Sequence, residues 1–256
     1  MAVDDICGVV QLEWLPVKQV LICIPDSDFD PTEVATPWHR LREAGFRVRF
    51  ASEHGDVGAC DPLLLQGVIF GQLGADTDAI ERYHRMIQSV EFQNPLNWHE
   101  LDAAAFDALV LPGGHAPGMK PYLESAPLRD LVLAFVRLDR PIAAICHGVL
   151  VLARTRDPQT GRSVLYGRTC TSLLATLERG AYWLTFWKLG KYYRTYSELV
   201  QDEVSRNLLQ KRDFKVGKAP WIPFAVRDGR LVTARWPRDA EVFSGELIHL
   251  LTGGEV

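Results

Sequence analysis

The sequence lacks any apolar run that approaches the roughly 18 residues a membrane-spanning helix requires. It also lacks an excess of basic residues, because 28 Lys and Arg stand against 32 Asp and Glu and the formal net charge is -4. Nucleic acids and anionic membrane surfaces are recognised by basic patches, so we expect neither as a partner. The N-terminal stretch MAVDDICGVV carries no basic n-region, and we therefore expect no signal peptide.

Cysteine is scarce, and no two cysteines have the Cys-x-x-Cys spacing of a metal or redox site. The five residues are Cys7, Cys23, Cys60, Cys146 and Cys170. An odd number without paired spacing disfavours a disulfide framework, and we expect a reducing, cytoplasmic location. We also expect no metal and no other cofactor.

The first part of the chain alternates between short apolar runs and a helical pattern. QVLICI (19–24) and FRVRFAS (46–52) have strand composition, and the segment 32–45 between them has the pattern of a helix that ends at Gly45. Strand, helix and strand in this order indicate a parallel sheet. FDALVLPGG (106–114) and RPIAAICHGVLVLAR (140–154) predict two further strands that run into turns.

Later segments complete the α/β pattern. Helices are expected at 76–90 and at 125–139, the latter with Ser125 as a cap. TRDPQTGRSVLYGRTCTS (155–172) is interpreted as a hairpin-like excursion that returns to a strand. The following elements are also expected: a helix at 197–212, two strands around Asp228-Gly229, and a closing helix at 237–251.

With 256 residues, 47% hydrophobic and 23% charged, the chain fits one large domain spanning 1–256. We expect residues 1–16 to form a peripheral strand or arm, and 178–217 to form an inserted helical cap or an interface segment. The aromatic stretch 182–196, YWLTFWKLGKYYRTY, is interpreted as a hydrophobic cap over the sheet or part of a dimer interface. The alternative is a surface for client proteins or membranes.

The segment P-I-A-A-I-C-H-G has the pattern of a nucleophile elbow, in which an apolar strand ends in a tight turn and a helix begins at once. Ala144 and Gly148 are small enough for the backbones to approach closely. This geometry predicts that Cys146 is exposed above the sheet, where the helix N-terminus favours its thiolate. The alternative is an inert buried cysteine.

L-P-G-G-H (111–115) ends the preceding strand and should lie at the same carboxyl edge of the sheet, where open α/β sheets bind ligands. The backbone amides of Gly114 and His147 are candidates for an oxyanion hole. His115 and Trp221 are candidate pocket residues, and His115 is also a candidate partner of the cysteine. The alternative for PGG is a plain strand-ending turn.

Acidic residues follow the first strand. On sequence alone, Glu33 is interpreted as a solvated carboxylate in the first turn of a helix. Asp26, Asp28 and Asp30 have alternate spacing but lack the glycine and terminal glutamate of a calcium loop, so they are interpreted as a solvated loop.

Three of these segments together resemble the DJ-1/PfpI superfamily, in its Hsp31-like branch: LPGGHAPGM (111–119), AAICHG (143–148) and residues 31–55. The resemblance implies one domain with a flavodoxin-like, three-layer α/β sandwich around a mostly parallel sheet, related to class I glutamine amidotransferases and commonly dimeric. It further implies that Cys146 is the nucleophile and His147 its neighbour. Glu33 would be a protonated carboxyl that is hydrogen-bonded to the sulfur.

Two segments depart from the family pattern. G-R-T-C-T-S (167–172) contains no acid or histidine that could orient His147. T-A-R-W-P-R-D (233–239) stands where the family has T-G-x-N-P-x-S, and Trp236 is large at a position that is usually polar.

The resemblance implies a glutathione-independent glyoxalase, which converts methylglyoxal into lactate and acts on a small carbonyl substrate as a homodimer. A first alternative is an amidase or peptidase. None of the seven histidines is followed by x-Glu, which disfavours the glutamine amidotransferase version of that alternative. A second alternative is a stress chaperone or redox sensor, because a reactive cysteine oxidises readily.

Overall fold

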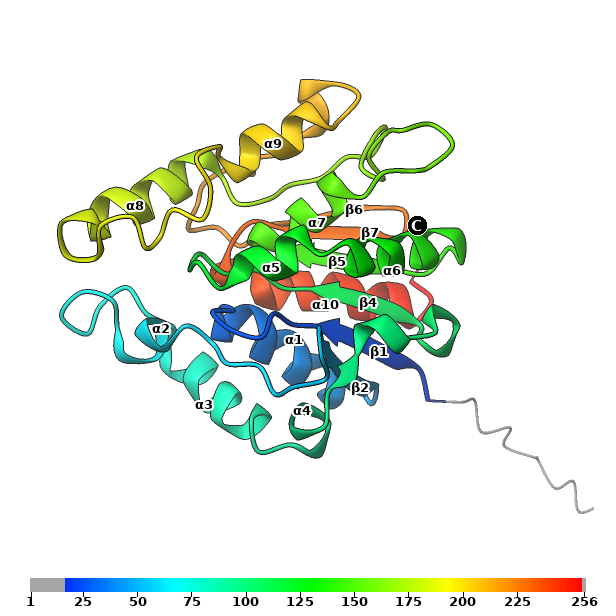
Figure 1. Ribbon diagram of the computed structural model, residues 1–256, viewed down its shortest axis with the longest axis horizontal. Helices are drawn as coiled ribbons and strands as arrows, with labels where there is room; N and C mark the ends of the chain where they lie inside the picture. Colours follow the sequence, from blue (N-terminus) through cyan, green and yellow to red (C-terminus); the bar gives the residue numbers. More distant parts are fainter. Residues whose placement is uncertain (1–16, 255–256) are drawn as a thin grey trace, which may run out of the picture.

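The structure is a computed structural model, which describes residues 17–254 (Figure 1). In this range seven strands form one sheet in the order β3-β2-β1-β4-β5-β7-β6. The strands are β1 (Gln19–Cys23), β2 (Arg47–Ser52), β3 (Leu96–Asn97), β4 (Ala108–Leu111), β5 (Ile142–Ile145), β6 (Ala225–Asp228) and β7 (Leu231–Ala234). All neighbouring pairs are parallel except β6 with β7. The arm expected at residues 1–16, which includes Cys7, lies outside the described residues.

Ten α-helices are found in the same range. They are α1 (Pro31–Glu43), α2 (Pro62–Gln66), α3 (Thr77–Met86), α4 (Val90–Gln93), α5 (Met119–Glu124), α6 (Ala126–Arg137), α7 (Val149–Arg154), α8 (Ala175–Leu189), α9 (Val200–Arg206) and α10 (Ala240–Leu251). None of these helices of residues 17–254 is both long and apolar enough to cross a membrane.

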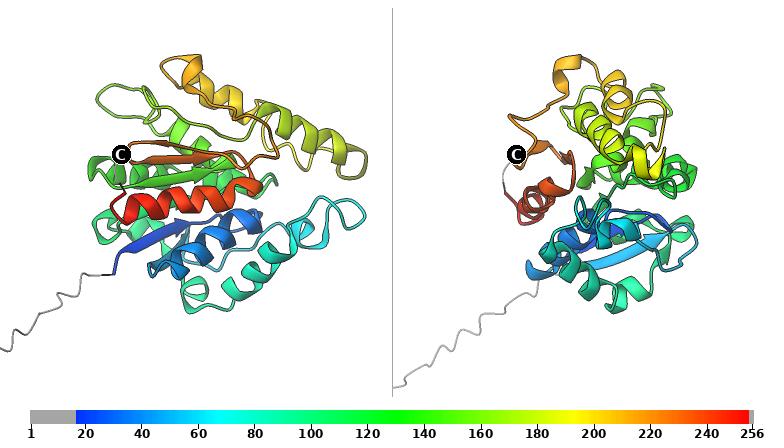
Figure 2. Two further views of the ribbon diagram at one scale, coloured as in Figure 1. Left: turned by 180° about the vertical axis from the view of Figure 1, so that it is seen from behind. Right: turned by 90° about the vertical axis from the view of Figure 1, so that its left-hand side faces the viewer.

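The helices cover both faces of the sheet, which gives three layers. On one face α1 packs against β1 and β2, and α10 packs against β5, β6 and β7. On the other face α6 contacts β4 and β5, and α7 contacts β5. Beyond this layer lie α8 and α9, along the top of Figure 1 and again in Figure 2. The arrangement confirms the expected mostly parallel α/β sandwich.

Local signals account for the elements that carry the site. The strands β4 (ALVL) and β5 (IAAI) are buried along their whole length, as the continuous apolar runs predict for central parallel strands. Asp30 caps α1, because its side chain accepts hydrogen bonds from the N–H groups of Thr32 and Glu33. Gly45, in the left-handed region with φ 84°, follows this helix as expected.

Ser125 caps α6, and β6 and β7 form the antiparallel hairpin predicted at Asp228-Gly229. Other expectations are wrong. No strand forms within 155–172, but an antiparallel bridge between Arg156 and Ser163 gives the expected hairpin-like turn, and a second bridge joins Cys170 to Phe214. The helix expected at 197–212 is reduced to α9, and the helix expected at 76–90 ends at Met86.

Candidate active site

The elbow forms where β5 ends. Cys146 has φ 58°, and it opens a 3-10 turn (Cys146–Gly148) that leads directly into α7. Positive φ is unusual for a residue with a Cβ and costs about 1–3 kcal/mol, so the surrounding structure must enforce it. A side chain at Gly148 would lie 2.2 Å from the Leu111 carbonyl oxygen, which explains the glycine. The sequence pattern therefore predicts this backbone correctly.

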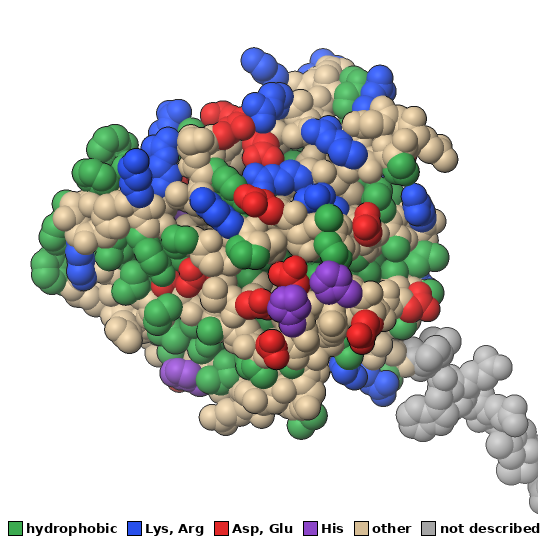
Figure 3. All heavy atoms as spheres, in the orientation of Figure 1, with side chains coloured by type: hydrophobic (Ala, Val, Ile, Leu, Met, Phe, Trp, Pro, Cys, Tyr) green, Lys and Arg blue, Asp and Glu red, His purple; other side chains and the backbone are tan. Residues whose placement is uncertain are grey.

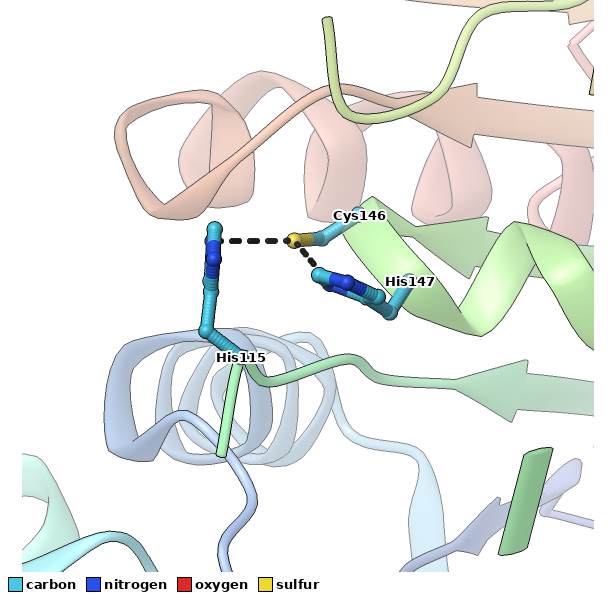
Figure 4. A group of neighbouring side chains, drawn as sticks. All are labelled: His115, Cys146 and His147. Atoms are coloured by element: carbon cyan, nitrogen blue, oxygen red, sulfur yellow. Dashed lines mark hydrogen bonds between the residues drawn. The ribbon is translucent and has the colours of Figure 1, made fainter. Parts of the chain in front are cut away.

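The expectation that Cys146 is exposed is wrong, since its exposed fraction is 0%. The imidazole of His115 lies over the sulfur, with Nε2 4.0 Å from Sγ (Figure 4). Thr195 fixes the backbone at His115, in the loop after β4, because its hydroxyl donates a 2.7 Å hydrogen bond to the His115 carbonyl. The thiol thus lies beneath a histidine rather than at an open surface.

Glu33 is not a solvated carboxylate, because its exposed fraction is also 0%. Its Oε2 accepts a 2.9 Å hydrogen bond from the N–H of Gly113. Its Oε1 is buried without a hydrogen bond of ordinary geometry among residues 17–254. The carboxyl nevertheless lies close enough to Cys146 for each group to shift the pKa of the other.

Burial and then the charge of Asp30 hold the pKa of Glu33 well above its ordinary value, so the protonated acid is favoured. Burial, followed by the Glu33 and Asp30 charges, raises the pKa of the Cys146 thiol as well, while the His147 N–H lowers it. Burial therefore acts against the thiolate that the helix N-terminus was expected to favour. A protonated Glu33 removes one of the two repelling charges and leaves the carboxyl able to donate to the sulfur.

Two neutral imidazoles flank the sulfur. His147 Nδ1 lies 3.6 Å from Sγ, and the two rings are T-shaped with centroids 4.8 Å apart (Figure 4). Burial lowers the pKa of His115 to about 4 and that of His147 well below its ordinary value. Either ring can thus accept the thiol proton. Transfer creates thiolate and imidazolium together, and the attraction between these two charges offsets part of their desolvation.

We call Glu33, His115, Cys146 and His147 the elbow cluster. Two nitrogen atoms of this cluster make no hydrogen bond: within residues 17–254, His147 Nε2 and His115 Nδ1 are buried without partners. No residue of the described chain therefore orients His147 through Nε2. The two rings and the sulfur also place three donor atoms within 4.8 Å of one another, a set that suits a soft metal. The expectation of no metal stays a prediction.

Three further residues near the cluster escaped sequence reasoning. A side chain at Gly113 would lie 2.7 Å from the backbone nitrogen of His147 and 2.9 Å from Glu33 Oε2, so only glycine fits. Asp30 is buried rather than solvated, and burial raises its pKa to about 6. Asp28 also departs from the solvated-loop interpretation, because its carboxylate accepts a 2.7 Å bond from Gly118. In the sequence, the two adjacent glycines at 113–114 were the signal that the backbone is closely approached at Gly113.

Gly114 lies against another part of the loop, since a side chain there would meet the Asp28 carbonyl at 2.5 Å. Its role in an oxyanion hole stays a prediction, as does that of the His147 amide. A cavity of about 770 Å³ opens beside the cluster and includes both candidate pocket residues, His115 and Trp221, in its lining. Trp221 is 71% exposed, and His115 is the member of the cluster that lines the cavity.

A buried ion pair holds one rim of this cavity. The Arg235 guanidinium donates to both carboxylate oxygens of Asp239, at 2.8 and 2.9 Å. Its remaining N–H groups donate to four carbonyls in residues 216–222, the loop that carries Trp221. Both side chains are 0% exposed. We call this arrangement the Arg235 clamp; it occupies the segment where the family pattern is broken.

The aromatic stretch is only partly buried. On α8, Trp183 and Trp187 are 68% and 63% exposed, whereas Tyr193 is buried and donates a 2.6 Å hydrogen bond to Asp61. Phe70, from the loop between α2 and α3, contacts Trp187 with ring centroids 6.2 Å apart. In Figure 3 hydrophobic side chains accordingly gather at the end of the molecule where α8 and this loop lie.

The resemblance implied a cysteine at an elbow with Glu33 beside its sulfur, and the structure brings Cys146 and Glu33 together at such a turn. A family model described as ThiJ/PfpI family-like matches residues 24–216. The chain belongs to this family. Residues 178–217 overlap the end of the match, and their role as a cap or interface stays a prediction.

Several relatives carry functional names. The chain is 23% identical to the glutathione-independent glyoxalase HSP31 of Saccharomyces cerevisiae, over 81% of this chain and 82% of that protein. It is 30% identical to the deglycase PfpI of Pyrococcus furiosus, over 60% of this chain and 72% of the relative. The solved structure of glyoxalase III from Candida albicans superposes with a TM-score of 0.69 at 21% identity, covering 90% and 96% of the two chains. This likeness shows the shared fold.

Proposed function

We propose that the protein is a cofactor-free, cysteine-dependent enzyme that converts methylglyoxal into lactate without glutathione. The observation that carries the proposal is the elbow cluster, which combines a nucleophile, a protonated acid and a neutral base in one buried site. The names of the yeast and Candida relatives support the same activity.

In the proposed reaction Cys146 loses its proton to His147, and the sulfur adds to the aldehyde carbon as Glu33 protonates the carbonyl oxygen. The resulting Glu33 carboxylate removes the hydrogen from the same carbon while the His147 imidazolium protonates the ketone oxygen, which gives an enediol. Glu33 then protonates the neighbouring carbon and takes the hydroxyl proton of the first carbon, which produces a thioester of lactate. Water then cleaves the C–S bond and the thiol regains its proton, so that methylglyoxal and water become lactic acid with no external oxidant or reductant.

The experiment is to incubate the purified protein with methylglyoxal alone and follow substrate and product by proton NMR. We expect stoichiometric lactate without added glutathione. Loss of methylglyoxal without lactate would indicate simple scavenging by thiols or arginines, and would overturn the proposal. Homodimerisation and a cytoplasmic location stay predictions that this experiment does not address.

A second candidate function is the binding of non-native proteins, which the exposed tryptophans of α8 favour. It predicts that Trp183→Ser with Trp187→Ser weakens suppression of aggregation of a heat-denatured client, whereas Cys146→Ala does not. The reverse result would assign any such protection to the thiol. Amide hydrolysis has no comparable support, because within residues 17–254 His147 Nε2 has no carboxylate partner.

A further inference from the structure

The cavity beside the elbow cluster is far larger than methylglyoxal requires. Its volume is about 770 Å³. Cavities of about 300–1,000 Å³ bind drug-sized ligands, whereas methylglyoxal carries only a methyl group beyond its two carbonyls. A substrate that small would leave most of the cavity to water, and the walls would contribute little to its binding.

The walls are mainly apolar and come from distant segments. One wall is a single face of α8, formed by Leu177, Gly180, Ala181 and Leu184 at helical spacing. Leu64, Val68, Leu73 and Ala79 lie around the cavity from the region of α2 and α3, and Trp221 and Trp236 line it near the Arg235 clamp. The lining includes Leu73 and Leu184, which are 52% and 58% exposed. Such side chains gain most from an apolar ligand that removes them from water.

The cavity ends at the histidine that covers the reacting sulfur. His115 belongs to its lining, and His115 Nε2 lies 4.0 Å from the Cys146 sulfur. A molecule whose body occupies the cavity would place a carbonyl at its inner end against His115, and a turn of that imidazole would admit the carbonyl to the sulfur. The apolar walls would then hold the part of the substrate that does not react.

We infer that the preferred substrate is a 2-oxoaldehyde whose ketone carries a large apolar group, such as an alkyl chain or an aryl ring. This inference rests on the glyoxalase chemistry proposed above. The reaction is unchanged: the aldehyde R–CO–CHO and water give the 2-hydroxy acid R–CHOH–COOH, with the aldehyde carbon oxidised and the ketone carbon reduced. Each methylene buried should raise kcat/KM by about threefold to fourfold.

A larger side chain at Gly180 would fill part of the cavity. A Cβ at this position meets no atom within 4 Å, and the residue lies on the lining face of α8. Gly180→Leu should therefore fill part of the cavity without disturbing the backbone. Gly245→Leu is the matched control, because Gly245 lies in α10, also has nothing within 4 Å of its Cβ, and is not part of the lining. Both variants replace a helical glycine by leucine.

The test compares kcat/KM for 2-oxooctanal and methylglyoxal in wild type and both variants. We expect wild type to prefer 2-oxooctanal by at least about tenfold. Gly180→Leu should remove most of this preference by lowering the rate on 2-oxooctanal, with less than about a twofold effect on methylglyoxal. Gly245→Leu should change neither. A wild-type preference for methylglyoxal, or equal losses on both substrates in Gly180→Leu, overturns the inference.

A binding measurement separates this inference from the proposed function. If wild type turns over neither aldehyde, the proposed function fails, and calorimetry with 2-octanone then decides the ligand class. Saturable binding of 2-octanone that Gly180→Leu weakens and Gly245→Leu preserves would keep an apolar ligand for the cavity. Absence of binding would overturn it. Turnover of methylglyoxal without the chain-length preference leaves the proposed function intact and rejects the inference alone.

Discussion

The elbow cluster and the Arg235 clamp are both buried sets of ionisable side chains, yet their hydrogen bonding is opposite. In the clamp every N–H group of the guanidinium reaches an acceptor, and Asp239 accepts two backbone N–H groups in addition. In the elbow cluster Glu33 Oε1, His115 Nδ1 and His147 Nε2 are buried without ordinary partners among residues 17–254.

This difference shows what distinguishes a reactive buried cluster from a structural one. Burial of an unpaired polar atom costs about 1–3 kcal/mol, so a native structure keeps few of them without a function. In the proposed function, the unpaired atoms at the elbow would bind a substrate carbonyl and take part in proton transfer. In the clamp, by contrast, the hydrogen-bonding groups of Arg235 are already bonded within the fold. Its bonds to backbone carbonyls hold the loop that carries Trp221.

Cys146→Ala should produce the largest effect. Turnover of methylglyoxal should fall by about 10⁴-fold or more, because the covalent step has no other nucleophile in the cluster. Since Cys146 is buried rather than exposed, the free energy of unfolding should also fall, by about 1 kcal/mol. Steady-state kinetics and urea unfolding measure the two effects. Turnover within tenfold of wild type would remove Cys146 from the mechanism.

Glu33→Gln should lower kcat/KM by about 10²–10⁴-fold, because the amide keeps the shape of the carboxyl but cannot exchange a proton. The rate at which iodoacetamide alkylates Cys146 should change far less, since the covering His115 remains. Glu43→Gln, at the exposed end of the same helix, is the control and should leave both rates unchanged. Parallel losses of turnover and alkylation would make Glu33 a packing residue instead.

Arg235→Met should destabilise the fold by about 3–5 kcal/mol, because Asp239 is left as an unpaired buried charge. Arg206→Met, which breaks the exposed pair with Glu198, should cost less than about 1 kcal/mol. Denaturant unfolding measures both. Adding Asp239→Leu to Arg235→Met should recover part of the loss. A cost below 1 kcal/mol for Arg235→Met would mean that the clamp is not structural.

The features that the sequence predicted are those with local causes. The apolar run IAAI fixes β5, and the small residues around Cys146 permit the elbow. The cap at Ser125 and the turn at Asp228-Gly229 likewise depend on neighbouring residues. Among the site residues, Cys146, His147, Glu33 and His115 were all candidates before the structure placed them together.

The features that sequence reasoning missed depend on distant contacts. Cys146 is covered because Thr195, 80 positions from His115, holds the carbonyl of that histidine. No strand forms in 155–172, because a few backbone hydrogen bonds close a short turn there and side chains take others that a ladder would supply. The Thr233 hydroxyl accepts from the Thr171 N–H, and the Ser163 hydroxyl donates to the Leu152 carbonyl. Strand composition alone does not reveal these competitors.

The smallest effect expected is a dependence of stability on pH that belongs to the elbow cluster. Burial lowers the pKa of His115 to about 4 from 6.5. Between these values the unfolded chain binds a proton that the folded chain does not, so stability falls as the pH decreases through the unfolded value. Replacing His115 by Gln removes this proton uptake but retains a polar side chain. Wild type should therefore lose more stability than the variant on acidification.

The expected difference is about 1 kcal/mol between about pH 7 and about pH 5.5, measured by urea unfolding at each pH. Asp30 and Glu33 act in the opposite direction, because their raised pKa values favour protons on the folded protein that the unfolded chain has released. They are present in both proteins, so the difference isolates His115. The control His249→Gln changes an exposed histidine of α10, far from the elbow cluster in the sequence, and should follow wild type. Identical pH dependence of wild type and His115→Gln would mean that the imidazole over the sulfur is charged or solvated, and the neutral base would then have to be His147 alone.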